Sequence, residues 1–198
     1  MRKPILIATA MLVAVASNAW GADAPTDIGK VASTLAAGVV AAAKSEAPGE
    51  RLRLLREAAG PVMDMKTIGE GVLAYAGAKV PSSRQAEVLD QVVDYVGGRI
   101  VQEIERIRPE RANVGPAEVK GESDAQLSMS LVGARDTIDV RWYFRKIGAT
   151  WRIVDGEVSG SRLTTYFGEQ LSRYAHGVDQ LVDYLRAQQK RSLTASRT

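Results

Sequence analysis

The sequence contains no cysteine and one histidine, His176, among its 198 residues. The absence of cysteine excludes disulfide bonds, thiolate metal sites, cysteine nucleophiles and lipid attachment through a lipobox cysteine. A single histidine also excludes a metal site built from paired histidines. We interpret His176 as a residue near the end of a helix, where a dipolar or positive ring is favourable.

A strong net charge, an internal repeat and a linker are also absent. The formal net charge is +3, and two of these positive charges, Arg2 and Lys3, belong to the first few residues. A nearly neutral remainder excludes the electrostatic surface that nucleic-acid binding requires. No run of Ser and Gly and no block of charge divides the chain, so we expect one domain.

The N-terminus has the pattern of an export signal. Arg2 and Lys3 precede an apolar run from Ile5 to Ala16, and Ala19-Trp20-Gly21 provides the small residues that a signal peptidase reads. The run is shorter than the roughly 20 residues needed to span a bilayer. We predict a signal peptide over residues 1–21 and a soluble exported protein; an uncleaved membrane anchor is the alternative.

Apolar residues at helical spacing predict helices on both sides of a central strand region. The longest begins at Ser82, carries one apolar stripe over about seven turns, and ends before Pro109. Asp64 is the predicted N-cap of the helix before it. The predicted helical segments are 28–47, 49–59, 64–75, 82–108, 161–176, which Gly177 would end, and 178–188.

The segment between these helices alternates with a period of two. Residues 124–132 predict one half-buried antiparallel strand. Residues 139–160 predict a hairpin, and a Gly148-Ala149 loop would place Phe144 opposite Ile153. We therefore predict an α+β fold in which helices cover an antiparallel sheet of about four strands.

Two patterns suggest chemistry but lack the required context. Gly69-Glu-Gly71-Val-Leu-Ala74 matches the letters of a dinucleotide fingerprint, yet a predicted helix start precedes it where the fingerprint needs a strand. Asp155 and Glu157 form an acidic pair at a strand end, and with His176 they make the alternative of a small hydrolase or isomerase. Without a basic or metal partner, we interpret the pair as a strand exit.

Two blocks of sequence follow the pattern of a known family. The first is Met63-Asp-Met-Lys-Thr-Ile-Gly-Glu-Gly-Val-Leu73, followed by a helix-opening segment from Pro81 to Leu89. The second runs from Ile138 through Gly148-Ala-Thr-Trp-Arg-Ile-Val-Asp155 to Leu185. Together they resemble the MlaC family of periplasmic phospholipid-carrier proteins, which includes hopanoid-associated relatives. The resemblance spans about residues 26 to 188. The chain departs from it at Arg162 and Gly168, and at Met63 and Met65, which replace aromatic residues.

The resemblance implies a nuclear-transport-factor-like fold that encloses an apolar cavity for acyl chains. It implies a lipid carrier, with no catalytic activity and no cofactor, that shuttles phospholipid between an outer-membrane lipoprotein complex and an inner-membrane ABC transporter. The protein would be periplasmic and monomeric. The predicted organisation is a signal peptide over 1–21, a single lipid-binding domain over 22–188 and a flexible basic tail over 189–198.

Within a carrier, apolar side chains on the long helix and the sheet would contact lipid, although the same periodicity is typical of ordinary core packing. A structural adaptor that docks on a transporter without ligand is a further alternative. The candidate lipid-binding residues are Val93, Val96, Ile100, Ile104, Leu127, Met129, Val140, Trp142, Phe144, Trp151 and Ile153.

Overall fold

The computed structural model describes residues 26–195 of the chain. The predicted signal peptide therefore lies outside the described residues. No helix within 26–195 is both long enough and apolar enough to cross a membrane.

Four α-helices precede the sheet and two follow it in the described part of the chain, as the hydrophobic pattern predicts. A single 3-10 turn, Ser82–Arg84, leads into the longest helix. The helices are α1 Thr26–Lys44, α2 Pro48–Ala59, α3 Met65–Ala76, α4 Gln85–Ile107, α5 Leu163–Ser172 and α6 Val178–Ala195.

Within residues 26–195, five strands form one antiparallel sheet in which every strand pairs with its neighbour in sequence. The fifth strand, which the sequence did not predict, has two residues and follows a tight turn. Ser159 and Gly160 in that turn both have positive φ, 52° and 80°, as a type I′ hairpin turn requires. The strands are β1 Pro109–Lys120, β2 Asp124–Gly133, β3 Thr137–Ile147, β4 Thr150–Val158 and β5 Ser161–Arg162.

The predicted register of the β3–β4 hairpin is confirmed, because Phe144 lies opposite Ile153. Beyond that pair β4 contains one extra residue, Val154, since Tyr143 pairs with Asp155. Such a bulge changes which face of the sheet the following side chains occupy. As a result Asp155 shares a face with Tyr143, and Gly156 lies opposite Trp142.

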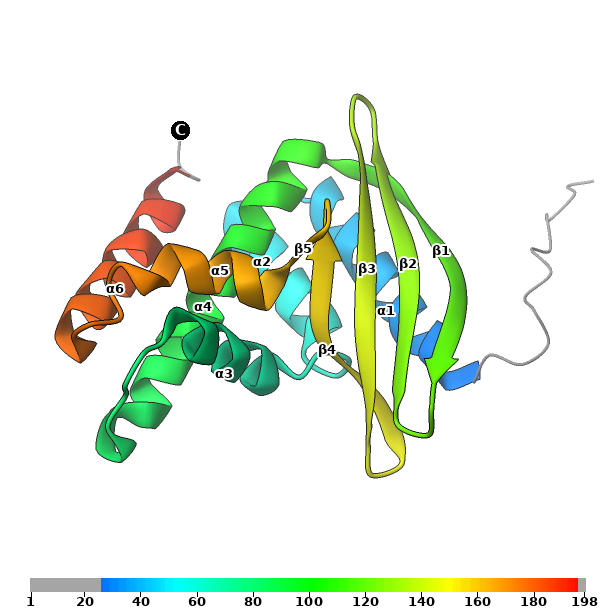
Figure 1. The fold of residues 1–198 in the computed structure, drawn as a ribbon. Coiled ribbons are helices and arrows are strands. Elements are labelled where there is room, and N and C mark those ends of the chain that lie inside the picture. The colour runs from blue at the N-terminus through cyan, green and yellow to red at the C-terminus, as the bar shows by residue number, and fades with distance from the viewer. Residues whose placement is uncertain (1–25, 196–198) are drawn as a thin grey trace, which may run out of the picture.

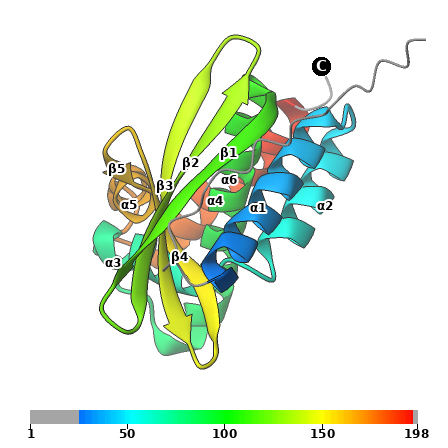
Figure 2. The same cartoon turned by 90° about the vertical axis from the view of Figure 1, so that its right-hand side faces the viewer.

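The helices form two groups around the sheet. Figure 1 shows α3, α4, α5 and α6 together on the left of the view, with β1, β2 and β3 on the right. Figure 2 shows α1 and α2 side by side next to the sheet, with α3 and α5 on the opposite side of the view. Helix α4 belongs to both groups, because its N-terminal half packs with α3 and α6 and its C-terminal half approaches the sheet.

The glycines of the apparent nucleotide fingerprint have a packing role inside α3. A Cβ atom at Gly69 would lie 2.7 Å from Leu89 Cδ1 on α4, and one at Gly71 would lie 2.9 Å from Thr164 Cγ2 on α5. Both distances are shorter than real Cβ contacts, so a side chain at either position would require its neighbour on the other helix to move. The fingerprint is thus the contact surface of a helix.

The predicted boundaries of the last two helices are wrong. The helix expected over 161–176 is α5, which starts at Leu163 because Ser161 and Arg162 pair with β4, and which ends at Ser172 without Gly177. Helix α6 continues to Ala195, so it extends beyond its predicted end at residue 188 and into the segment predicted as a basic tail. The Asp64 N-cap is confirmed, because its side chain accepts a hydrogen bond from Thr67 N.

Candidate functional site

The apolar interior consists of two clusters. The sheet cluster joins α1, residues 62–68, Ile104 and the inward side chains of β2, β3 and β4. The helix cluster joins α3, the N-terminal half of α4, α5 and α6. In the described chain, three half-buried side chains pack against both clusters: Met65, Ile100 and Leu163. We call these three residues the junction.

Two contacts with β4 hold the junction in place. Asp64 N donates to Ile153 O at 2.8 Å, which fixes the start of α3 and therefore Met65. The Asp155 carboxylate accepts from Thr164 N at 3.4 Å and from Thr164 Oγ1 at 2.8 Å, which fixes the start of α5 and therefore Leu163. Met65 and Leu163 are the first residues of their helices, so β4 positions both.

Helix α4 is loosely packed where it passes the junction. Residues 97–102 are all half-buried, although buried positions recur on either side of them. A Cβ atom at Gly97 would meet no other atom within 4 Å, so close packing does not explain this glycine. Glycine inside a helix costs about 0.5–1 kcal/mol relative to alanine. Gly97 thus lowers the stability of α4 close to the place where the two clusters meet.

The eleven predicted lipid-binding residues divide between the clusters. Nine are buried, and Val93 and Ile100 are half-buried. The structure brings Ile104 together with the seven sheet residues in the sheet cluster, whereas Val96 belongs to the helix cluster. Phe144, Leu127, Met129 and Ile153 are at most 1% exposed, so these side chains are closely packed and do not line an open cavity.

The sequence pattern missed two of the three junction residues. Met65 and Leu163 each follow a polar residue at the N-terminal boundary of a helix, Asp64 and Arg162. An apolar residue directly after such a boundary is the only signal in the sequence that could have identified them. Ile100 was predicted because it lies on the apolar stripe of α4.

Trp142 lies beside the junction and has an unmet hydrogen bond. Its Nε1 is buried without a hydrogen-bond partner among the described residues. The six-membered ring covers Gly156, where a Cβ atom would come within 2.8 Å of Trp142 Cζ3 and 2.9 Å of Leu163 Cδ1. A buried donor that finds no acceptor costs about 1–3 kcal/mol.

Comparisons with known proteins find a family whose sequence pattern matches this chain and a solved structure with a similar fold. The family described as MlaC protein matches residues 30–187, more than three quarters of the chain. The chain belongs to the MlaC family. The fold also agrees with a solved structure, a phospholipid-binding protein from Ralstonia solanacearum in complex with a phospholipid, at 16% sequence identity and a TM-score of 0.65. The alignment covers 87% of this chain and 99% of that one. Curated proteins give no significant match.

These comparisons confirm the predicted resemblance and the α+β fold. The MlaC match starts at residue 30 and ends at 187, so it includes the whole sheet and the three junction residues. The R. solanacearum structure shares the fold at low sequence identity. The predicted apolar cavity is not shown by the described residues.

The two main departures from the MlaC pattern have structural contacts of their own. The Arg162 guanidinium lies 3.9 Å from the centre of the Tyr143 ring, and its Nη1 lies 3.6 Å from Asp155 Oδ2. Gly168 lets α5 approach α3, since a Cβ atom there would lie 2.7 Å from Tyr75 Cβ. Both residues therefore stabilise the α5 region of this MlaC protein.

The alternative catalytic group is not assembled. Asp155 caps the first turn of α5, whereas the exposed His176 follows its last turn, about 15 Å away for a helix of this length. Glu157 accepts a hydrogen bond from Tyr143 Oη and lies 3.3 Å from Arg141 Nη1. Within residues 26–195 no group of three acidic or histidine side chains is arranged to hold a metal ion.

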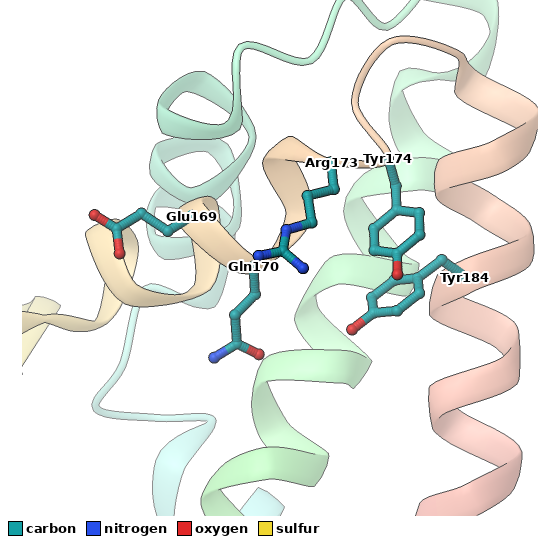
Figure 3. A pocket seen from close by; sticks show the side chains of 5 residues that line it. All are labelled: Glu169, Gln170, Arg173, Tyr174 and Tyr184. Atoms are coloured by element: carbon teal, nitrogen blue, oxygen red, sulfur yellow. The ribbon is translucent and has the colours of Figure 1, made fainter.

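A separate polar pocket of about 330 Å³ lies between the end of α5 and α6. Figure 3 shows the Tyr174 and Tyr184 rings, stacked 3.9 Å apart, beside Arg173. Gln170 Oε1 accepts from Tyr95 Oη at 2.8 Å, and burial raises the pKa of the Tyr95 hydroxyl, which keeps it a donor. This polar lining does not suit acyl chains, which favour apolar pockets.

Proposed function

We propose that the chain is a periplasmic carrier that holds the acyl chains of a phospholipid, or of a related membrane lipid, between the sheet cluster and the helix cluster. The observation that carries this proposal is the junction, where two separate apolar clusters share Met65, Ile100 and Leu163. Membership of the MlaC family supports it. The phospholipid held by the R. solanacearum protein of the same fold also supports it.

The proposal requires the clusters to separate when lipid enters. Burial of each CH2 group contributes about 0.8 kcal/mol, so acyl chains replace the apolar contacts that separation breaks. Opening the junction costs less than opening either cluster, because its three side chains are only half-buried. Gly97, which has space around it on α4, lets the helix bend there.

The transport role follows from the family. We propose that the carrier takes lipid between an outer-membrane lipoprotein complex and an inner-membrane ABC transporter, and so maintains the lipid asymmetry of the outer membrane. It acts as a monomer without a cofactor or a catalytic step. The contacts of Asp155 and Glu157 support this, since both carboxylates are engaged in structural interactions.

The close packing of the sheet cluster favours a second candidate. Nine of the eleven predicted lipid-binding side chains are buried, as expected for a structural adaptor that docks on a transporter and holds no ligand. The two candidates differ in one observable property, which is whether the purified protein binds lipid.

A pair of matched variants tests the carrier. Ile100→Glu places a charge at the junction, and Ile147→Glu places the same charge at a position that is 45% exposed at the end of β3. We expect Ile100→Glu to lose lipid retention and Ile147→Glu to keep it, with the folding of both checked by circular dichroism. Retention by folded Ile100→Glu would contradict the proposed site, and no lipid on the wild type would favour the adaptor.

A further inference from the structure

Trp142 differs from the other buried groups that have unmet hydrogen bonds. The others are nitrogens of Arg51 and Arg152, and each of these guanidinium groups also donates through another nitrogen, Arg51 to Ser45 O and Arg152 to Met63 O. An indole has a single donor. The single hydrogen-bond donor of the Trp142 side chain is therefore unused, although the residue is buried, with only 8% of its surface exposed.

The position of Trp142 connects this free donor to the junction. Trp142 Cζ3 and Leu163 Cδ1 both lie within 3 Å of the position that a Gly156 Cβ atom would take. The edge of the indole that carries Cε3 and Cζ3 faces Gly156. Nε1 is on the other side of the ring system, so this contact with Gly156 does not involve the N–H, which remains a buried free donor beside the junction.

A lipid offers two kinds of acceptor. The phosphate is charged, and its transfer into an apolar cluster would be costly without a paired cation. The ester carbonyls are neutral and are joined directly to the acyl chains, so they enter the apolar layer with them. An ester carbonyl is therefore the acceptor that a buried, neutral N–H beside an acyl-chain site would bind.

We propose that Trp142 Nε1 donates a hydrogen bond to an ester carbonyl of the bound lipid, and that this bond makes the protein select ester-linked over ether-linked lipids. The inference rests on the proposed carrier function. It assigns Trp142 a role in lipid specificity in addition to its packing against Gly156 and Leu163. An ether oxygen is a poorer acceptor than a carbonyl, so an ether lipid leaves the indole N–H unpaired.

The experiment compares two lipids that differ only in this linkage. Vesicles of dioleoyl phosphatidylglycerol and of its dioleyl ether analogue are offered to the wild type, to Trp142→Phe and to Tyr166→Phe. Tyr166 is a control outside the candidate lipid-binding residues, since it is 43% exposed on α5 and its substitution also removes one hydrogen-bond donor. The amount of lipid bound at equilibrium gives the affinity ratio for each protein.

We expect the wild type and Tyr166→Phe to bind the ester lipid about two- to tenfold more tightly, the range for one neutral hydrogen bond. Trp142→Phe should bind both lipids equally. The indole N–H resonance of Trp142 in the wild type should shift downfield with the ester lipid and not with the ether lipid, which tests the bond even if Trp142→Phe does not fold.

The outcomes separate this inference from the function on which it rests. Equal wild-type affinity for both lipids, or an unchanged Trp142 resonance, overturns the ester contact and leaves the carrier function intact. A preference for the ester lipid that persists in folded Trp142→Phe assigns the selection to another residue and also overturns it. Failure of the wild type to bind either lipid overturns both.

Discussion

Trp142 on β3 lies directly opposite Gly156 on β4, and its six-membered ring occupies the space that a side chain at residue 156 would need. The bulge at Val154 produces this pairing, because without the extra residue Asp155 would lie opposite Trp142. The bulge instead places the Asp155 carboxylate where it caps α5. The bulge residue Val154 thus determines two features. These are the Trp142–Gly156 contact beside the junction and the start of α5, which carries Leu163.

The Trp142–Gly156 contact predicts a loss of stability in Gly156→Ala. The new methyl group would lie 2.8 Å from Trp142 Cζ3 and 2.9 Å from Leu163 Cδ1, and overpacking of this kind costs about 1–3 kcal/mol. Urea unfolding followed by tryptophan fluorescence measures this loss. An unchanged free energy of unfolding would show that the Trp142 indole can move to make room for the methyl group, which would contradict close packing at this contact.

Gly97→Ala should have the opposite effect. The alanine methyl group meets no atom within 4 Å, and alanine stabilises a helix interior by about 0.5–1 kcal/mol relative to glycine. Gly168→Ala is the control on a neighbouring helix, since its methyl group would lie 2.7 Å from Tyr75 Cβ and should destabilise the protein. A destabilised Gly97→Ala would indicate a neighbour that the structure does not show.

Asp155 and Glu157 should differ in their effect on stability. Asp155→Asn weakens the cap on Thr164 and the ion pair with Arg162 at a position that is 5% exposed; loss of a capping interaction costs about 1 kcal/mol. Glu157→Gln alters a half-buried contact with Tyr143 and a more exposed ion pair with Arg141 and should cost less than about 1 kcal/mol. Thermal unfolding of both variants checks this order, and equal losses would contradict it.

Asp64 should contribute stability that depends on pH. Burial alone would raise the pKa of the Asp64 carboxyl, but hydrogen bonds from Thr67 N and Oγ1 and the charges of Arg152 and Lys66 outweigh it, so the pKa is lowered. A lowered pKa means that the contribution is complete above the ordinary value of about 3.9 and is lost as the pH falls through the folded-state value.

Comparison of Asp64→Ala with the wild type measures this effect. We expect the variant to be less stable by about 1 kcal/mol at pH 7, with the difference shrinking once the pH falls below about 4. Thr34→Ala is a control for loss of a hydroxyl on an exposed helix surface and should show no such pH dependence. A difference between Asp64→Ala and the wild type that stays constant down to pH 2 would contradict the lowered pKa.

The sequence pattern was sufficient to predict those structural features that form between residues close together in the chain. The alternation on both sides of Gly148-Ala149 fixed the Phe144–Ile153 pair, and the Asp64 cap followed from its position before Met65. The bulge at Val154 has no sequence signal of its own. The start of α5 also could not be predicted, because pairing of Ser161 and Arg162 with β4 determines it.

The site was only partly predictable for a similar reason. The apolar stripe of α4 has one period throughout, yet Val96 and Ile104 belong to different clusters. Periodicity shows that a side chain is turned inward, but it does not show which element packs against it. The junction residues Met65 and Leu163 lie at helix starts, so their role depends on where β4 holds those starts.

The most direct test of the carrier is mass spectrometry of the intact purified protein under native conditions, before and after incubation with phospholipid vesicles. We expect a population heavier than the chain by the mass of a phospholipid, which lipid extraction then identifies, and which Ile100→Glu lacks. A wild-type protein that carries no lipid as purified and takes none from vesicles would contradict it.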